Sequence, residues 1–353
     1  MATVSVSQLK AGEKIIENVQ TKRGNVLFMK GRIVLEKDIE ILKAFLIPTV
    51  IIESKSNDSS EQSDEPIADE PVNSILPFFE QYTKMLNLLR KVFISVGGSN
   101  FPILEVRTQL EALIRYIDQY QILTFSPKSY QLSDFLLHNS IMVSLTSYKL
   151  ALWQGLPTKD LMPVALSGLL HDIGNAKVDA AILHKPKKLT PDELEEIKQH
   201  TVIGYNLLKN VAAINEGVKL SALQHHERED GSGYPLGIKG DQIHLYSKIV
   251  AIADMFHAMT SDRYHKKAAS PYLVLDQLFT ESFGKLDPHM VQTFIHKVTE
   301  FHNGVLVKLS DGKIGEIVFS DRANPTRPWV NVNGQIINLT MQRNLYIQDV
   351  IQK

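Results

Sequence analysis

Residues 161–174 read LMPVALSGLLHDIG, and they decide the fold of the middle of the chain. Apolar residues recur at three- and four-residue spacing from Leu161 to Leu170, which predicts a buried helix. Gly174 can stop this helix and leave His171 and Asp172 side by side at its end. An imidazole next to a carboxylate suits a metal ion. Taken alone, the same pair also fits an ordinary polar helix end.

Working outward, the helical spacing extends over residues 74–302 and predicts one helical domain. Residues 54–73 are polar and acidic and bury too little apolar surface to order themselves, which indicates a flexible linker. Residues 1–53 alternate short apolar stretches with turn signals, and we expect strands around one helix at residues 39–45. The fold class is therefore mainly α, with a small N-terminal α/β or β-rich domain ahead of the helices.

The last part of the chain, residues 303–353, changes to alternation of apolar and polar residues. Asp311-Gly312 and Asn333-Gly334 are typical of hairpin turns between such stretches. The sequence predicts a small, barrel-like C-terminal β domain.

The composition of the chain limits the metal ligands and the binding partners that it can have. The chain has no cysteine, so a metal ion must be held by histidine and carboxylate. The formal net charge of −1 disfavours binding to bulk nucleic acid. We find no signal peptide and no apolar run of the roughly 20 residues that a membrane span needs, so we expect a cytoplasmic protein. A homodimer is left open.

Further metal-type residues lie in the helical domain. Asp134 and His138 are four apart and would share one helix face, where they can bind an ion or simply each other. His200 follows a helix start at Thr190 and Pro191, on the helix that they open. His225 and His226 place two imidazoles side by side. Asp254 lies in an apolar helix, where a carboxylate is costly unless it is paired or metal-bound.

The order of these elements resembles the HD-GYP subgroup of the HD phosphohydrolases. The resemblance covers Asp134 to Lys267. It rests on these motifs: His138, His171-Asp172-Ile173-Gly174, His200, His225-His226-Glu227, Gly233-Tyr234-Pro235 and the run from Asp254 to Arg263-Tyr264.

This resemblance implies hydrolysis of cyclic di-GMP to linear pGpG or GMP in bacterial signalling. It implies a centre of two divalent transition-metal ions, or three, with iron or manganese expected first and nickel or zinc also compatible. His171 and Asp172 would be the catalytic pair, with Asp172 bridging two ions. The implied metal ligands are Asp134, His138, His171, Asp172, His200, His225, His226 and Asp254.

The residues implied to contact substrate are Asn175, Lys177, Gly233, Tyr234, Pro235, Arg263 and Lys267. The glycines and proline of the loop also fit a plain helix connection. Arg263 and Lys267 also fit a solvated basic helix end. Two positions depart from the family: Asp134 stands where three-metal members have Glu, and Asn175 where a Lys is usual.

Two other functions stay open. Asn175 favours a catalytically weak or inactive receptor for cyclic di-GMP. A phosphohydrolase of the wider HD class acting on another nucleotide would share the helices and metals, although Gly233-Tyr234-Pro235 argues against it.

Overall fold

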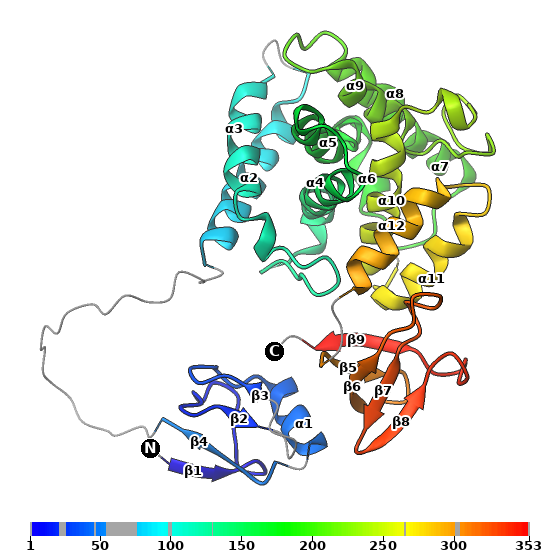
Figure 1. Ribbon diagram of the computed structural model, residues 1–353. Coiled ribbons are helices and arrows are strands. Elements are labelled where there is room, and N and C mark those ends of the chain that lie inside the picture. The colour runs from blue at the N-terminus through cyan, green and yellow to red at the C-terminus, as the bar shows by residue number, and fades with distance from the viewer. Residues whose placement is uncertain are drawn as a thin grey trace, which may run out of the picture. The chain divides into compact units, whose positions relative to one another are not determined.

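The computed structural model describes residues 2–20, 26–45, 47–53, 76–97, 101–128, 130–264, 266–300 and 304–351. The chain forms two compact units. One unit is Ser74–Phe301, and the other combines Met1–Asn73 with His302–Lys353. Figure 1 shows helices throughout the first unit and the labelled strands, β1 to β9, in the second, which confirms the predicted fold class. The predicted linker at residues 54–73 lies outside the described residues.

The helical unit is built from helices that follow each other from cyan to orange in Figure 1. They are α2 (Leu76–Ser95), α3 (Ile103–Ile114), α4 (Phe135–Trp153), α5 (Thr158–Leu170), α6 (Ala180–Leu183), α7 (Pro191–Lys198), α8 (His200–Leu208), α9 (Glu216–Gln224), α10 (Leu245–Thr260), α11 (Pro271–Glu281) and α12 (Pro288–Thr299). Short 3₁₀ segments are η1 (Ile117–Gln119), η2 (Leu132–Asp134), η3 (Ile173–Lys177) and η4 (Gly240–Gln242).

Helix α4 is the centre of this unit. It is buried on nearly all sides and packs against α2, α5, α10 and α12. Gly168 lets α5 approach closely, because a Cβ there would lie 2.8 Å from the Ser144 Cα. The Ser144 hydroxyl also donates to the Ala165 carbonyl at 2.7 Å. The end of α5 that carries His171 and Asp172 is thereby fixed against the core.

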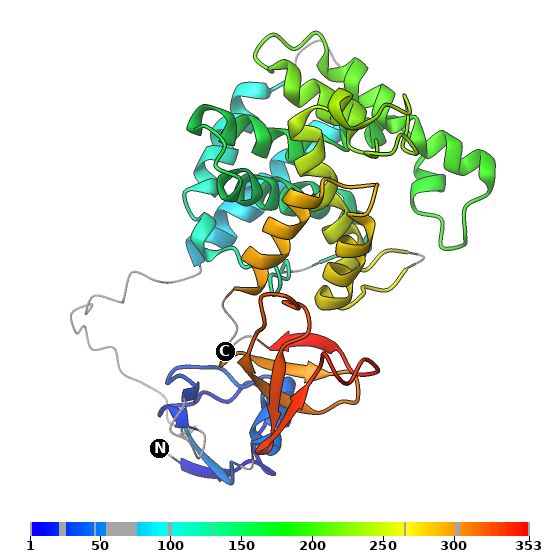
Figure 2. The same ribbon diagram turned by 45° about the vertical axis from the view of Figure 1, so that its right-hand side comes forward.

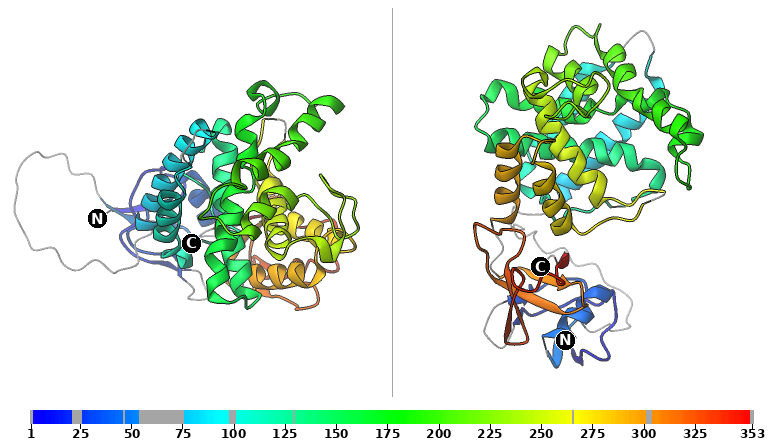
Figure 3. Two further views of the ribbon diagram at one scale, coloured as in Figure 1. Left: turned by 90° about the horizontal axis from the view of Figure 1, so that it is seen from above. Right: turned by 90° about the vertical axis from the view of Figure 1, so that its right-hand side faces the viewer.

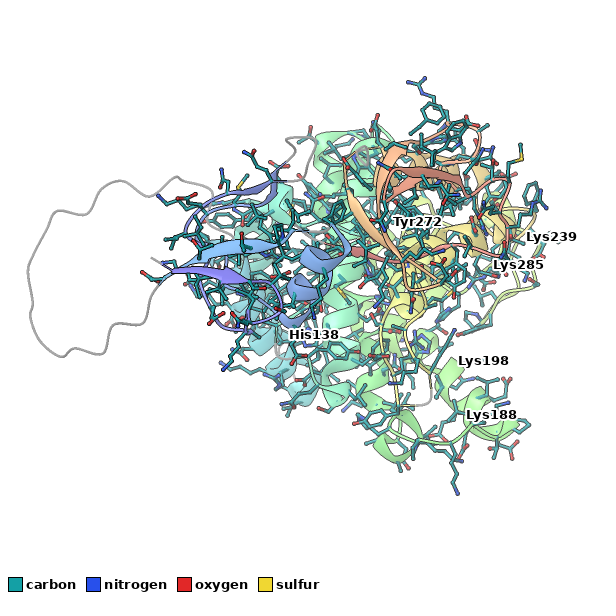
Figure 4. All side chains as sticks on the ribbon, turned by 90° about the horizontal axis from the view of Figure 1, so that it is seen from below. His138, Lys188, Lys198, Lys239, Tyr272 and Lys285 are labelled. Atoms are coloured by element: carbon teal, nitrogen blue, oxygen red, sulfur yellow. The ribbon has the colours of Figure 1, made fainter. Side chains whose placement is uncertain are left out.

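The segment from α6 to α7 stands away from the body of the helical unit (Figures 2 and 3). Lys188, in the connection between these two helices, and Lys198, at the end of α7, are labelled on this segment in Figure 4.

The described residues of the terminal unit form three sheets. β1 (Ala2–Ser5) pairs antiparallel with β4 (Thr49–Ile52), and β2 (Val19–Gln20) with β3 (Val26–Phe28). Helix α1 spans Glu36–Ala44, in agreement with the predicted helix. The C-terminal strands form one antiparallel sheet in the order β8-β7-β6-β5-β9: β5 (Leu306–Leu309), β6 (Ile314–Phe319), β7 (Trp329–Val332), β8 (Gln335–Asn338) and β9 (Ile347–Ile351).

The hairpin turn predicted at Asn333-Gly334 joins β7 and β8, and both residues have the positive φ that a two-residue type I′ turn requires. Both ends of the chain contribute to one hydrophobic core. Leu306 and Ile314 pack there with N-terminal residues such as Ile15 and Leu42. The two terminal segments therefore share their packing.

None of the helices in the described part of the chain is long and apolar enough to cross a membrane.

Candidate metal centre

The predicted metal ligands come from the ends of three helices and the interior of a fourth. They are His171 and Asp172 after α5, His200 at the start of α8, His225 and His226 after α9, and Asp254 within α10. Thr190 caps α7 as predicted, since its hydroxyl accepts from the Glu193 N–H. The prediction that His200 lies on this helix is wrong: α7 ends at Lys198 and His200 opens the next helix.

Asp172 lies among three imidazoles. Its Oδ1 is 3.2 Å from the Nε2 of His200 and 3.8 Å from the Nε2 of His225. Its Oδ2 is 3.4 Å from the Nε2 of His171, which is also 3.4 Å from the Asp254 Oδ1. One carboxylate therefore faces both sides of the cluster, as a ligand that bridges two ions must.

Two overlapping groups have ligand atoms within 4.8 Å of one another: His200 with His225 and His226, and His171 with Asp172 and His225. His225 belongs to both groups. Ligand sets of this kind, placed side by side and sharing a residue, fit two neighbouring divalent ions.

The orientation of the imidazoles favours metal binding. In three of them Nδ1 bonds to a backbone carbonyl, which can only accept, so Nδ1 carries the proton and Nε2 faces the centre. The pairs are His171 with Gly168 at 2.8 Å, His200 with Ile197 at 2.6 Å and His225 with Ser221 at 2.9 Å. The Nε2 of His171 is buried and has no hydrogen-bond partner.

Burial and mutual repulsion set the charges of the cluster. Burial lowers the pKa of His225 and His226 well below the usual value, and the neighbouring imidazoles lower it further. Burial opposes charge on His171 too, but the carboxylates of Asp172 and Asp254 raise its pKa well above the usual value. Burial would raise the pKa of Asp172, yet His171 and His200 lower it. Neutral imidazoles and charged carboxylates are the forms that bind metal. Asp172, His225 and His226 favour these forms already, whereas the raised pKa of His171 means that this imidazole would release a proton when it binds an ion.

Gly174 does not end helix α5 as the sequence predicted. Helix α5 already ends at Leu170, and Gly174 lies inside η3. A Cβ on Gly174 would overlap the His200 carbonyl oxygen. Glycine is required here because the start of α8 crosses η3, and this crossing brings His200 to Asp172.

Asp134, His138 and Asp254 lie outside the two ligand groups in the described residues, so the assignment of Asp134 and His138 as ligands stays a prediction. Asp134 forms an ion pair with Arg90 of α2 at 3.0 Å. The Nδ1 of His138 hydrogen-bonds to the Tyr82 hydroxyl at 2.9 Å, and His138 is labelled in Figure 4. The Nε2 of His138 is buried and has no hydrogen-bond partner.

Asn139, which was not predicted from the sequence, also contacts the cluster. Its Nδ2 donates to the Asp254 Oδ1 at 2.9 Å. The four-residue spacing from Asp134 to His138 was the signal that pointed to this helix, and no such spacing marks Asn139.

The Gly233-Tyr234-Pro235 loop folds back onto the histidine pair. The Tyr234 ring stacks on His226 with 4.7 Å between the ring centroids. The buried Glu227 carboxylate accepts the backbone N–H groups of Leu236 at 2.7 Å and Ile238 at 3.2 Å. A Cβ on Gly233 would overlap the backbone of His226 to Arg228. The loop is therefore a wall of the centre, held by Glu227.

The other predicted substrate residues differ in exposure. Asn175 is buried in η3, whereas Lys177 and Lys267 are exposed. The side chain of Lys177 lies beside Gly97: a Cβ added to Gly97 would be 3.1 Å from the Lys177 Nζ. The Arg263 guanidinium lies 4.4 Å above the Phe135 ring, and its buried Nε has no hydrogen-bond partner.

Comparison with known proteins identifies the helical region. The family model described as HD domain matches residues 124–290. A cyclic di-GMP phosphodiesterase of Pseudomonas aeruginosa is 34% identical over 194 residues, which are 55% of this chain and 47% of that protein. A 3′3′-cGAMP-specific phosphodiesterase of Vibrio cholerae is 34% identical over 171 residues, 48% of this chain and 39% of that protein. The matched region thus spans less than half the length of either relative.

Among solved structures, an HDG"Y"P protein from Bdellovibrio bacteriovorus is similar to 83% of this chain and 97% of its own, with a TM-score of 0.51 and 16% sequence identity. This likeness concerns the fold. The resemblance inferred from the motifs is confirmed for the helical domain: residues 124–290 match the HD domain family, and the similar proteins over this region include a cyclic di-GMP phosphodiesterase.

Proposed function

We propose that this protein is a metal-dependent phosphodiesterase that hydrolyses cyclic di-GMP. The observation that carries the proposal is the Asp172 carboxylate, which lies 3.2–3.8 Å from the Nε2 atoms of His171, His200 and His225. The sequence relatives of this domain are named as phosphodiesterases of cyclic dinucleotides.

Two divalent ions would be held by His171, Asp172, His200, His225, His226 and Asp254. Iron or manganese suits this mixture of nitrogen and oxygen ligands. When bound, such ions lower the pKa of a water molecule and neutralise charge on a phosphate. The chain's own residues orient the ligands: the carbonyls of Gly168, Ile197 and Ser221 fix three imidazole tautomers. The Tyr234 ring, stacked on His226, gives a planar surface for a guanine base and excludes water.

Phosphate contacts are assigned to the basic and amide side chains near the HD motif. Arg263 can bind phosphate in a bidentate manner, and its buried Nε has no partner. Asn175 follows His171-Asp172 and is buried, so it would donate a neutral hydrogen bond where a lysine would bring charge. Lys177 and Lys267 are exposed and would act as point charges.

The test is incubation of the protein, reconstituted with manganese or with iron under anaerobic conditions, with cyclic di-GMP and in parallel with 3′3′-cGAMP. We expect metal-dependent conversion of cyclic di-GMP to pGpG or GMP, separated by chromatography. Faster conversion of 3′3′-cGAMP would assign the chain the specificity of its Vibrio cholerae relative. Tight binding of cyclic di-GMP by metal-loaded protein without any product would assign it to receptors.

A further inference from the structure

A lysine that belongs to none of the motifs lies against the wall of the metal centre. The ammonium group of Lys198, which is labelled in Figure 4, is 5.5 Å from the centroid of the Tyr234 ring. Tyr234 in turn stacks on the ring of His226, with 4.7 Å between the centroids. Lys198 therefore contacts a side chain that itself contacts one of the clustered histidines.

The backbone at Lys198 is fixed by the same junction that places His200. Helix α7 ends at Lys198 and α8 begins at His200. The Ile197 carbonyl accepts a hydrogen bond from the His200 Nδ1 at 2.6 Å, and the Lys198 carbonyl accepts one from the Thr201 hydroxyl at 3.0 Å. His200 and Thr201 are buried. The base of the Lys198 side chain is therefore held beside the centre.

The present ionic partner of Lys198 is easily replaced. Its Nζ lies 2.6 Å from the Oε1 of Glu195, three residues earlier on α7, and the Glu195 side chain is 66% exposed. Exposed pairs of this kind stabilise a protein little, because water screens both charges. A phosphate oxygen could take the place of the Glu195 carboxylate at little cost.

We infer that Lys198 binds the phosphate of the cyclic dinucleotide that is not being cleaved. This inference rests on the proposed function. A cyclic dinucleotide carries two phosphodiester groups, each with one negative charge, and metal ions at the centre neutralise the one that is attacked. The other phosphate is left for a cation of the protein. A flexible ammonium group beside the Tyr234 ring meets this need as a point charge.

The Arg228 guanidinium follows the same histidine pair in the sequence but is already engaged. It donates to the backbone carbonyls of His225 at 3.3 Å and Glu227 at 2.9 Å. Giving up these bonds for a phosphate would release the backbone that carries the histidines. Lys198 gives up an exposed carboxylate instead.

This assignment also bears on the neutral residue after the HD motif. Asn175 is buried in η3 and brings no charge to the substrate, and the Lys177 side chain lies beside Gly97. Lys198 supplies a positive charge from another element, the end of α7. The absence of a lysine at position 175 is thereby offset.

Two substrates separate binding of the second phosphate from the chemistry at the metal centre. Cyclic di-GMP has two phosphates, whereas bis(4-nitrophenyl) phosphate has one. Both are given to Mn²⁺-loaded wild type and to the variants Lys198→Gln, Lys198→Arg, Glu195→Gln and Lys209→Gln. Lys209 is the matched control, because it is an exposed lysine at the other end of α8 whose Nζ donates to Asn206 at 2.9 Å.

We expect Lys198→Gln to raise the KM for cyclic di-GMP by about tenfold. The effect on kcat should be smaller, because the contact with a remote phosphate is the same in the ground state and the transition state. Lys198→Arg should restore most of the affinity, and Glu195→Gln, which frees the ammonium group, should lower the KM. The KM of Lys198→Gln should also depend less on salt concentration than that of wild type.

Hydrolysis of bis(4-nitrophenyl) phosphate and the affinity for Mn²⁺ should be the same in Lys198→Gln, Lys209→Gln and wild type. An unchanged KM for cyclic di-GMP in Lys198→Gln would overturn the inference. Equal losses with both substrates would overturn it too, since Lys198 would then act on the metal centre itself.

Wild type that cleaves bis(4-nitrophenyl) phosphate but not cyclic di-GMP would refute the proposed function rather than the contact. The dissociation constants of cyclic di-GMP for wild type and Lys198→Gln then take the place of KM. Equal dissociation constants, or no binding by wild type, would overturn the inference.

Discussion

At the scale of single residues, the centre depends on Asp172, the carboxylate that faces three imidazoles. Asp172→Asn retains the shape of the side chain but removes the charge that two cations would share. Replacing an outer partner of a metal ligand costs about 10–100-fold in affinity or activity, so loss of a bridging ligand should cost more. We expect metal content to fall and hydrolysis to drop by over about 100-fold, measured by elemental analysis and product formation. Asp192→Asn on the exposed first turn of α7 is the control and should match wild type.

His257 gives a pH dependence of stability. Its Nε2 lies 2.6 Å from the Thr146 hydroxyl and 3.2 Å from the Tyr120 hydroxyl. Burial lowers the pKa of His257 from 6.5 to about 3. Between these two values the unfolded chain binds a proton that the folded chain does not. The free energy of unfolding should therefore fall with decreasing pH through this window, by about 1.4 kcal/mol per pH unit from this group.

The measurement compares metal-free wild type with His257→Gln by denaturant unfolding at several values between pH 6.5 and pH 5. The variant lacks the titrating group, so its unfolding free energy should depend less steeply on pH. Parallel curves for the two proteins would contradict the assignment.

The six residues that the structure brings together were predictable from the sequence through the family resemblance, and Asp254 also because a carboxylate in an apolar helix is costly without a partner. His171, Asp172, His200, His225, His226 and Asp254 all meet in the structure. Asn139 was not predictable in the same way. Asparagine occurs in helices for many reasons. The contact of Asn139 with Asp254 depends on how α4 is rotated relative to α10, and no local sequence pattern predicts that rotation.

At the scale of elements, the crossing of η3 by α8 is a tight backbone contact. Gly174→Ala would place a Cβ onto the His200 carbonyl and force the two segments apart. Overpacking of this kind costs about 1–3 kcal/mol. We expect a lower Tm and a lower metal content, because His200 moves away from Asp172.

Gly204→Ala is the matched control, on the α8 side of the same crossing. Its added Cβ meets no atom closer than 3.4 Å, and alanine favours a helix over glycine by about 0.5–1 kcal/mol. The Tm should stay the same or rise. If both alanine variants behaved alike, the crossing would not be the critical contact.

The loop after the histidine pair is held by one carboxylate. Glu227→Gln replaces an oxygen that accepts a backbone N–H with an amide donor, and a buried donor left unpaired costs about 1–3 kcal/mol. We expect faster hydrogen exchange at the amides of Leu236 and Ile238 and a higher KM for the cyclic dinucleotide. The same change at exposed Glu196 should leave both unaltered, and unchanged exchange in Glu227→Gln would exclude the bracing role.

The start of α7 was predictable because its signal is local: a threonine cap followed by proline and acidic residues. The break at Gln199 was not, since residues 191–208 carry no glycine or proline at that point. The break lets His200 turn toward Asp172, so it is a product of tertiary packing.

At the scale of the whole molecule, two distant segments build the terminal unit. Removing residues 1–73 would expose Leu306 and Ile314, which are buried in the shared core. We expect this truncated protein to aggregate more than one that also lacks residues 302–353. The doubly truncated protein should retain metal and hydrolysis within about tenfold, equivalent to about 1.4 kcal/mol, because all the ligands lie in the helical unit. Solubility, metal content and turnover of the two proteins test this.

The sharing of one core by both terminal segments also bears on biosynthesis. Leu306 and Ile314, which complete the core of the residues before Glu53, leave the ribosome about 250 residues after them. This is a delay of roughly 12–50 s at about 5–20 residues per second. During this delay the helical unit can finish folding, whereas the N-terminal segment waits with its apolar side chains uncovered. In nascent chains, the apolar residues before Glu53 that belong to this core are therefore a long-lived binding site for chaperones.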